Sequence, residues 1–170
     1  PKNMGLSSEE IKERVISAAK ALEIRPELLK KSPFELSGGQ KKRLSIAVEF
    51  IADPSLFFLD EPDSGIDDVM GRGLMETLRE IADLGKIIMV ITHSPERAAD
   101  LFDKVIVLAK STKDNCGHLA FFGGVQQAFD FFGVNSFREI VKKINRPDEN
   151  GEGLSDYFIE KYQSLQGGAL

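Results

Sequence analysis

The order of apolar and polar positions along the chain predicts helices first, followed by strands that alternate with helices. Ser7 and Glu10 have the spacing of a helix-capping box, and apolar residues then recur at helical intervals as far as Leu22. Pro26 suits the first turn of a short helix, and Ser37 opens a longer helix that ends near residue 53. The apolar stripe predicted for this longer helix consists of Leu44, Ala47, Val48 and Ile51.

Two short apolar runs, residues 55–60 and 87–92, have the composition of parallel strands that are buried on both faces. A helix over about residues 67–82 separates them, which favours an α/β sheet that is at least partly parallel. Asp60 ends the first run and His93 follows the second. The carboxyl end of a parallel strand is a usual place for a functional side chain, so both residues are candidates.

The remainder of the chain adds two strands and several helices to this pattern. The predicted elements are a short helix from residue 94, strands over 104–109 and 118–122, helices within 125–144 and a last helix over about 154–165. Three phenylalanines of this region, Phe129, Phe131 and Phe132, either pack on the sheet or form an apolar patch for a partner.

Composition narrows the class of protein without identifying a function. The chain has 170 residues, enough for a domain with its own core, and its 42% hydrophobic content is typical of a soluble globular protein. A net charge of -5 argues against a general nucleic-acid binder, which is usually basic. Cys116 is the only cysteine, which excludes an internal disulfide and fits a reducing compartment.

The segment Ser37-Gly38-Gly39-Gln40 is a candidate anion site. Two glycines at a helix start let the backbone approach a ligand, and the free N–H groups of the first turn attract phosphate. The same residues also fit a plain capped helix after a glycine turn. The three basic residues that follow, 41–43, are either a solvated face or a group that steers phosphate.

Asp60 and Glu61 are candidates for chemistry on a phosphorus atom. A carboxylate at a strand tip is well placed to hold Mg²⁺, and a second acid beside it can polarise a water for attack. An imidazole at His93 can hydrogen-bond a phosphate and orient that acid. Each residue alone also fits a structural role, and Ser64 to Asp67 has the local pattern of a turn that caps a helix.

Taken together, the four segments have the order found in the ATP-binding cassette (ABC) family, which this chain resembles over about residues 32–108. The resemblance implies that residues 36–40 are the signature loop and that 57–60 are the Walker B strand. It makes Asp60 the Mg²⁺ ligand, Glu61 the catalytic glutamate and His93 the switch histidine. Ser37, Gly38, Gly39, Gln40 and the D-loop residue Asp67 would then contact ATP.

The implied fold is α/β, a partial P-loop NTPase (RecA-like) three-layer core with a helical signature subdomain. The implied divisions are residues 1–45 for the helical subdomain, 46–124 for the ATPase core and 125–170 for a C-terminal helical extension. Within the family, the helix after the signature loop and the hairpin at 117–123 resemble White-type exporters. Asp63 departs from the family, which usually has a small or neutral residue there.

One family motif does not occur in the sequence. No Gly-x-x-x-x-Gly-Lys-Ser/Thr loop is present, so the backbone that grips the phosphates of ATP is missing from these residues. Three helices before the first strand also suggest that strands precede this segment in the natural protein, which would leave an exposed sheet edge. We therefore expect the 170 residues to be the C-terminal part of a cassette and to be inactive alone.

The resemblance also implies partners and a location. In the family, two cassettes pair head to tail, and a transmembrane domain converts their closure into transport at the cytoplasmic face of a membrane. No nucleic-acid partner is expected for a transporter cassette. Two alternatives stay open: a soluble ABC-type ATPase of DNA repair or chromosome maintenance, which the acid at Asp63 favours, and a non-catalytic cassette that serves as an interaction module.

Overall fold

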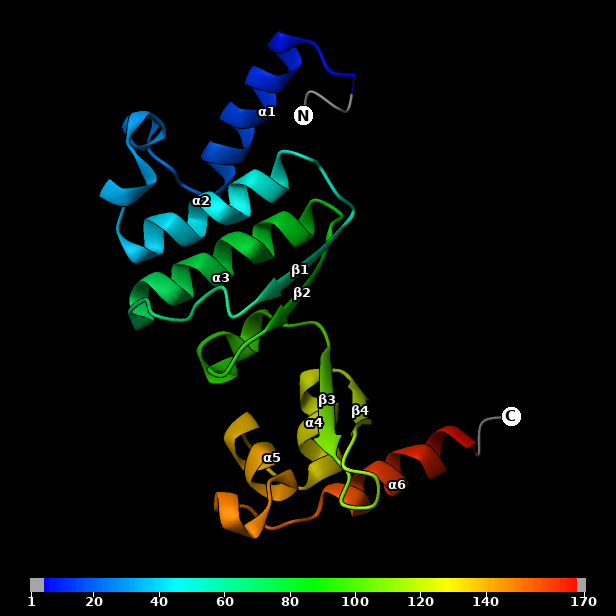
Figure 1. Cartoon of the computed structure of the whole chain (residues 1–170). Helices are drawn as coiled ribbons and strands as arrows, with labels where there is room; N and C mark the ends of the chain where they lie inside the picture. The colour runs from blue at the N-terminus through cyan, green and yellow to red at the C-terminus, as the bar shows by residue number, and fades with distance from the viewer. Residues whose placement is uncertain (1–4, 168–170) are drawn as a thin grey trace. The chain divides into compact units, whose positions relative to one another are not determined.

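The computed structural model describes residues 5–167, which form two compact units with the boundary between Ala98 and Ala99 (Figure 1). The first unit begins with α1 (Ser8–Ala21), and the predicted capping box of Ser7 and Glu10 is confirmed. Two short 3-10 helices follow, η2 (Pro26–Lys30) and η3 (Pro33–Glu35), and then α2 (Gly38–Phe50).

The apolar stripe predicted for α2 is partly wrong. Ala47 is buried as expected, but Val48 is 58% exposed, and Ile46 is buried in its place. Figure 1 shows the reason, because α2 lies between α1 and α3 (Asp68–Asp83). A helix with neighbours on two sides buries residues outside a single stripe.

The two predicted strands pair in parallel, as expected. β1 (Leu56–Asp60) and β2 (Ile87–Ile91) are in register from Leu56 opposite Ile87 to Asp60 opposite Ile91, and α3 makes the crossover between them. Phe57 and Leu59 are buried. In β1, Leu56 and Phe58 are 42% and 68% exposed, so burial on both faces was a wrong expectation.

The reason for this difference is the number of layers that the described residues form. Successive side chains of a strand point to opposite faces. Figure 1 shows α3 along one face of the two strands. Ile87 and Ile91 are exposed on β2 in the same way as their partners on β1. The two-stranded parallel sheet therefore positions the ends of both strands but is packed on one side among residues 5–167.

The second unit is built on an antiparallel hairpin of β3 (Val105–Lys110) and β4 (Gly117–Gly123), as the sequence predicted. Four helices follow: α4 (Val125–Phe132), α5 (Phe137–Ile144), the 3-10 helix η5 (Pro147–Glu149) and α6 (Ser155–Gly167). Phe132 is buried in the core of this unit, and Phe129 and Phe131 pack against it. The phenylalanines therefore pack inside rather than form a patch.

Candidate functional site

The predicted signature segment begins α2 through a complete capping box. The Ser37 hydroxyl accepts a hydrogen bond from the Gln40 N–H at 3.3 Å, and the Gln40 side chain accepts one from the Ser37 N–H at 3.0 Å. Ser37 and Gly38 are exposed. The structural interpretation of these residues is therefore correct, and it leaves the first turn of the helix open to solvent for a ligand.

Gly39 brings the signature segment against the turn of residues 64–67. A Cβ atom at Gly39 would lie 2.9 Å from the Cε of Met70 and 3.2 Å from the Cγ2 of Ile66. Glycine therefore lets α2 and this turn approach closely, and a side chain here would require Met70 to move and Ile66 to shift slightly. Asp67 caps α3, since its Oδ1 accepts a hydrogen bond from the Met70 N–H at 2.9 Å.

The two acids lie at the carboxyl end of β1. Asp60 ends the strand with an exposed side chain, and the N–H of Glu61 extends the parallel ladder to the carbonyl of Ile91 at 2.8 Å. Glu61 has a φ of 46°, a conformation that costs a residue with a side chain about 1 kcal/mol or more. Strain of this kind collects at functional sites, where the surroundings hold it in place.

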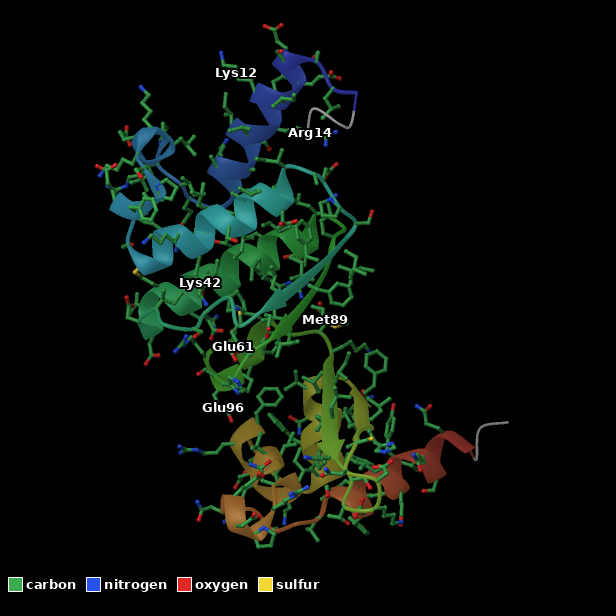
Figure 2. All side chains as sticks on the ribbon, in the orientation of Figure 1. Lys12, Arg14, Lys42, Glu61, Met89 and Glu96 are labelled. Atoms are coloured by element: carbon green, nitrogen blue, oxygen red, sulfur yellow. The ribbon has the colours of Figure 1, made fainter. Side chains whose placement is uncertain are left out.

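The basic segment after the signature loop supports this strained residue. Lys42 reaches from α2 and donates a hydrogen bond to the main-chain carbonyl of Glu61, and both residues are labelled in Figure 2. Arg43 pairs with Glu23 at 2.7 Å. Lys42 and Arg43 are therefore engaged within the fold, and Lys41 is the exposed residue of the three.

Glu61 and His93 come together although they are far apart in the sequence. The Nε2 of His93 lies 2.8 Å from Oε1 of Glu61, and their side chains are 84% and 39% exposed. A contact this accessible to water contributes little to stability. The arrangement instead places an acid and an imidazole at the ends of two adjacent parallel strands, open to a ligand.

Asp63 has a partner that sequence reasoning missed. Its carboxylate is 5% exposed, accepts hydrogen bonds from the Thr92 hydroxyl at 3.0 and 3.1 Å, and pairs with Arg97 at 3.1 Å. A buried carboxylate needs such partners to offset its desolvation. The departure of Asp63 from the family was the one signal in the sequence, but nothing there identified Arg97.

The acidic residues fit Mg²⁺ only if water molecules and the phosphates of a nucleotide supply most of the ligands. No group of three His, Cys, Asp or Glu side chains within residues 5–167 is arranged to hold a metal by itself. Mg²⁺ commonly keeps several waters and binds one or two carboxylates together with the phosphates of a nucleotide. Asp60, exposed at its strand tip, suits that role.

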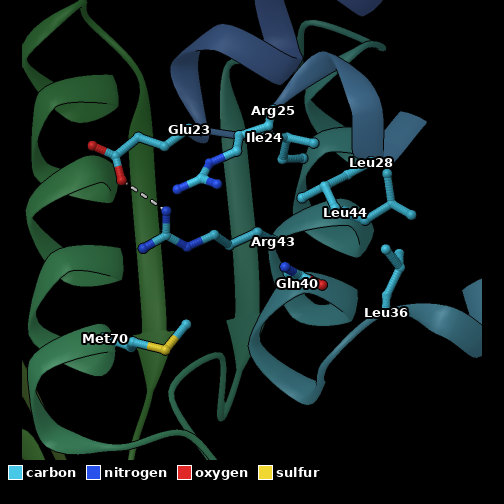
Figure 3. A pocket seen from close by; sticks show the side chains of 9 residues that line it. All are labelled: Glu23, Ile24, Arg25, Leu28, Leu36, Gln40, Arg43, Leu44 and Met70. Carbon is cyan, nitrogen blue, oxygen red and sulfur yellow. Dashed lines mark hydrogen bonds and ion pairs between the residues drawn. The ribbon is translucent and has the colours of Figure 1, made fainter. Parts of the chain in front are cut away.

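A cavity of about 260 Å³ lies behind the signature segment, between the 3-10 helix η2, α2 and α3 (Figure 3). Its wall is about equally polar and apolar, and the ion pair of Glu23 and Arg43 crosses one side. Gln40 and Met70 also line it, whereas Glu61 and His93 do not. The cavity is therefore separate from the candidate chemical site.

Known proteins that are similar to this chain are components of ABC transporters. The family model described as "ABC transporter" matches residues 2–64. The chain is 40% identical over 130 residues to the energy-coupling factor transporter ATP-binding protein EcfA2 of Caldanaerobacter subterraneus subsp. tengcongensis. The aligned region covers 76% of this chain and 43% of the relative. The chain spans about half the length of the curated relatives it matches.

Solved structures show the same fold. CbiO1 of Clostridium perfringens, part of the ABC transporter complex CbiONQ, superposes with a TM-score of 0.64 at 30% identity, over 84% of this chain and 52% of that one. The dimeric bacterial ABC transporter cassette MJ0796 gives a TM-score of 0.53 at 28% identity, over 59% and 44% of the two chains.

Among residues 5–167, no helix is both long and apolar enough to cross a membrane. The predicted α/β fold of a P-loop NTPase cassette is confirmed by these structural neighbours. Over part of their length, ABC transporter ATP-binding domains are therefore similar to this chain both in sequence and in fold.

Proposed function

We propose that this chain supplies the signature loop, Mg²⁺ ligand, catalytic glutamate and switch histidine of an ATPase that drives an ABC transporter. The observation that carries the proposal is the 2.8 Å contact between Glu61 and His93 at the ends of two parallel strands. Lys42, from the signature helix, holds the main chain of the same glutamate. Glu61 thus has contacts both with His93 and with the helix that follows the signature loop.

In the proposed reaction, Glu61 accepts a hydrogen bond from a water and draws off its proton. The water oxygen forms a bond to the γ-phosphorus of ATP while the bond from that phosphorus to the β–γ bridging oxygen breaks. ADP leaves with the bonding electrons, and the proton passes to the released phosphate. His93 orients Glu61 and donates to a γ-phosphate oxygen. Bound through Asp60, Mg²⁺ would supply positive charge to the phosphates.

The nucleotide itself would be gripped by a Walker A loop, which the 170 residues do not contain. In a head-to-tail pair, Ser37, Gly38, Gly39, Gln40 and Asp67 would complete the ATP site of a second cassette. The exposed position of Ser37 and Gly38 at the start of α2 supports that assignment. The similar cassette MJ0796 has a dimeric structure, which also supports pairing of this kind.

The rest of the assembly is part of the same proposal. The cassette would bind a transmembrane domain at the cytoplasmic face of the membrane, with residues 1–45, 46–124 and 125–170 as its helical subdomain, ATPase core and extension. The sequence of the signature helix and of the 117–123 hairpin supports a White-type exporter. The relative and the structural neighbour named above belong to other ABC types.

Structural observations weigh against both alternative classes of protein. Asp63 has a structural reason to be acidic, because it pairs with Arg97, so the acid no longer favours a DNA-maintenance ATPase. A non-catalytic interaction module would not need the contact between Glu61 and His93. The experiment below separates an ATPase from an interaction module.

The test is Glu61→Gln in the complete gene product, measured as steady-state ATP turnover and as ATP-dependent association by size-exclusion chromatography. Gln cannot accept the proton of water, so we expect turnover to fall by about 10²-fold or more while the ATP-bound pair accumulates. The isolated 170 residues should hydrolyse no ATP. Substantial turnover by Glu61→Gln would exclude the role assigned to Glu61, and no turnover in the unaltered protein would favour an interaction module.

A further inference from the structure

Arg97 links two segments that the proposed function places around ATP. It lies close to His93 in the sequence, and its side chain contacts the residues on either side of the 64–67 turn. It follows His93 by four residues, and its main-chain N–H donates to the carbonyl of Ser94 at 3.2 Å. Its guanidinium is largely buried, with 17% of the side chain exposed. Arg97 lies in the 3-10 helix η4 (Pro95–Leu101), which directly follows the segment that carries His93.

The guanidinium joins both ends of the turn formed by residues 64–67. Its Nη1 lies 3.1 Å from a carboxylate oxygen of Asp63, directly before the turn, and its Nη2 lies 2.6 Å from Asp68, directly after it. A planar guanidinium can hold two carboxylates at fixed directions, which a single ammonium group cannot do. The Asp68 carboxylate is 91% exposed, so the pair with buried Asp63 is the stronger of the two. Arg97 thus links both ends of the turn that packs against Gly39 and anchors it mainly at Asp63.

Thr92 extends this link to the other side of His93. Its hydroxyl donates to Asp63 and accepts a hydrogen bond from the Ser94 N–H at 3.0 Å. The residues before and after His93 are thereby tied to one hydroxyl and, through it, to Asp63. On the same short segment, the Ser64 N–H donates to the carbonyl of Glu61 at 3.1 Å. His93 is thus held by contacts of its neighbours Thr92 and Ser94 to Asp63, and Glu61 is held by the residue after Asp63.

We propose that Arg97 is a positioning residue, which through Asp63 keeps His93 and the 64–67 turn in fixed relation to Glu61. The inference rests on the proposed function, since it assigns an effect on the chemistry of that site. Arg97 touches none of the reacting atoms. It acts on the main chain that carries Glu61 and His93, because the contact between these two side chains is too exposed to fix its own geometry.

Gly71 of α3 provides a way to move Arg97 without removing a charge. A Cβ at Gly71 would lie 2.4 Å from the Nη1 of Arg97 and 3.1 Å from its Cδ and Cζ, so Gly71→Ala must displace the flexible guanidinium. Gly73 is a matched control on the same helix, because a Cβ there meets its nearest neighbour, Arg43, at an ordinary 3.8 Å. Alanine favours a helix equally at both positions.

The experiment measures kcat, KM for ATP and thermal midpoint for Gly71→Ala, Gly73→Ala, Arg97→Met and the double variant Gly71→Ala/Arg97→Met in the complete protein. We expect Gly71→Ala to lower kcat on the order of 10- to 10²-fold with KM nearly unchanged. Its thermal midpoint should fall less than that of Arg97→Met, because the displaced guanidinium can stay near the buried Asp63 carboxylate. Gly73→Ala should match the unaltered protein. The double variant should have the kcat of Arg97→Met, because Gly71→Ala acts only by displacing Arg97.

Three outcomes would overturn the inference: equal kcat for the two alanine variants, a fall in kcat that merely follows a fall in thermal midpoint, or additive effects in the double variant. Arg97→Met leaves Asp63 buried without its charge partner and is expected to lose stability, so Gly71→Ala carries the test if that variant does not fold. Glu61→Gln, measured alongside, separates the two proposals. If it retains turnover the proposed function fails, whereas loss of turnover with a normal Gly71→Ala rejects only the role of Arg97.

Discussion

At the scale of single residues, the site depends on main-chain conformations with a positive φ, which residues other than glycine rarely adopt. Glu61 and Gly65 have φ values of 46° and 73°, and they lie within five residues of each other. Glycine adopts such a conformation freely, whereas a glutamate must be held there. Hydrogen bonds to the carbonyl of Glu61 from Lys42 and from the Ser64 N–H provide that support.

Gly65 allows the conformational cost to be measured by itself. A Cβ at Gly65 would meet no atom within 4 Å, so Gly65→Ala adds no clash and introduces only the cost of a positive φ. We expect a loss of about 1 kcal/mol in the free energy of unfolding, measured by urea titration. Gly117→Ala is the control, with open space and no positive φ. An equal effect of both substitutions would show that the conformation of Gly65 is not strained for alanine.

Asp156 gives a residue-scale prediction on pH. Hydrogen bonds from the side chains of Ser111 and Thr112 lower the pKa of Asp156 below its ordinary value. A carboxyl group with a lowered folded-state pKa stabilises the fold above its unfolded-state pKa, and this stabilisation is lost as pH falls through the folded-state value. Asp156→Asn should therefore lower the thermal midpoint near pH 7, and the difference from the unaltered protein should shrink below about pH 4. A difference that stays constant down to about pH 3 would contradict this.

At the scale of elements, the sequence predicted where helices begin better than what they bury. Ser7, Ser37 and Asp67 each cap a helix at the predicted place, because capping requires only residues that are neighbours in the chain. Parallel pairing of β1 and β2 also followed from the local pattern. Exposure of Phe58 and Val48 did not, since burial depends on which other elements cover a face.

The same distinction applies to the candidate site. Glu61 and His93 were identified from their types and their positions at strand ends, and the structure brings them within hydrogen-bonding distance. Arg97 and Thr92 were not identified, because their importance depends on the burial of Asp63, which no local pattern reveals. For Lys42 the sequence left two interpretations, a solvated face or a group that steers phosphate. Its hydrogen bond to the Glu61 carbonyl fits neither of them.

At the scale of the whole molecule, the described chain has two hydrophobic cores. Leu74, Leu78 and Ile81 of α3 are buried in the first unit, together with Phe57 and Leu59 of β1. The core of the second unit is rich in aromatic residues, and Phe132 lies 4.6 Å from Phe158 and 6.2 Å from Phe121 between ring centroids. Each unit therefore carries its own apolar packing, and the chemical site lies in the first.

This division predicts that damage to one core spares the other. Phe132→Ala removes a side chain that is 3% exposed and should cost the second unit about 3–5 kcal/mol. Native-state hydrogen exchange should then report faster exchange for the main-chain N–H groups of β3 and β4, with those of α3 and β1 unchanged. Phe122→Ala is the matched control, because that ring is 51% exposed and its loss should change little. Equal acceleration in both units would mean that they unfold together, and the catalytic acids would then depend on the aromatic core for their stability.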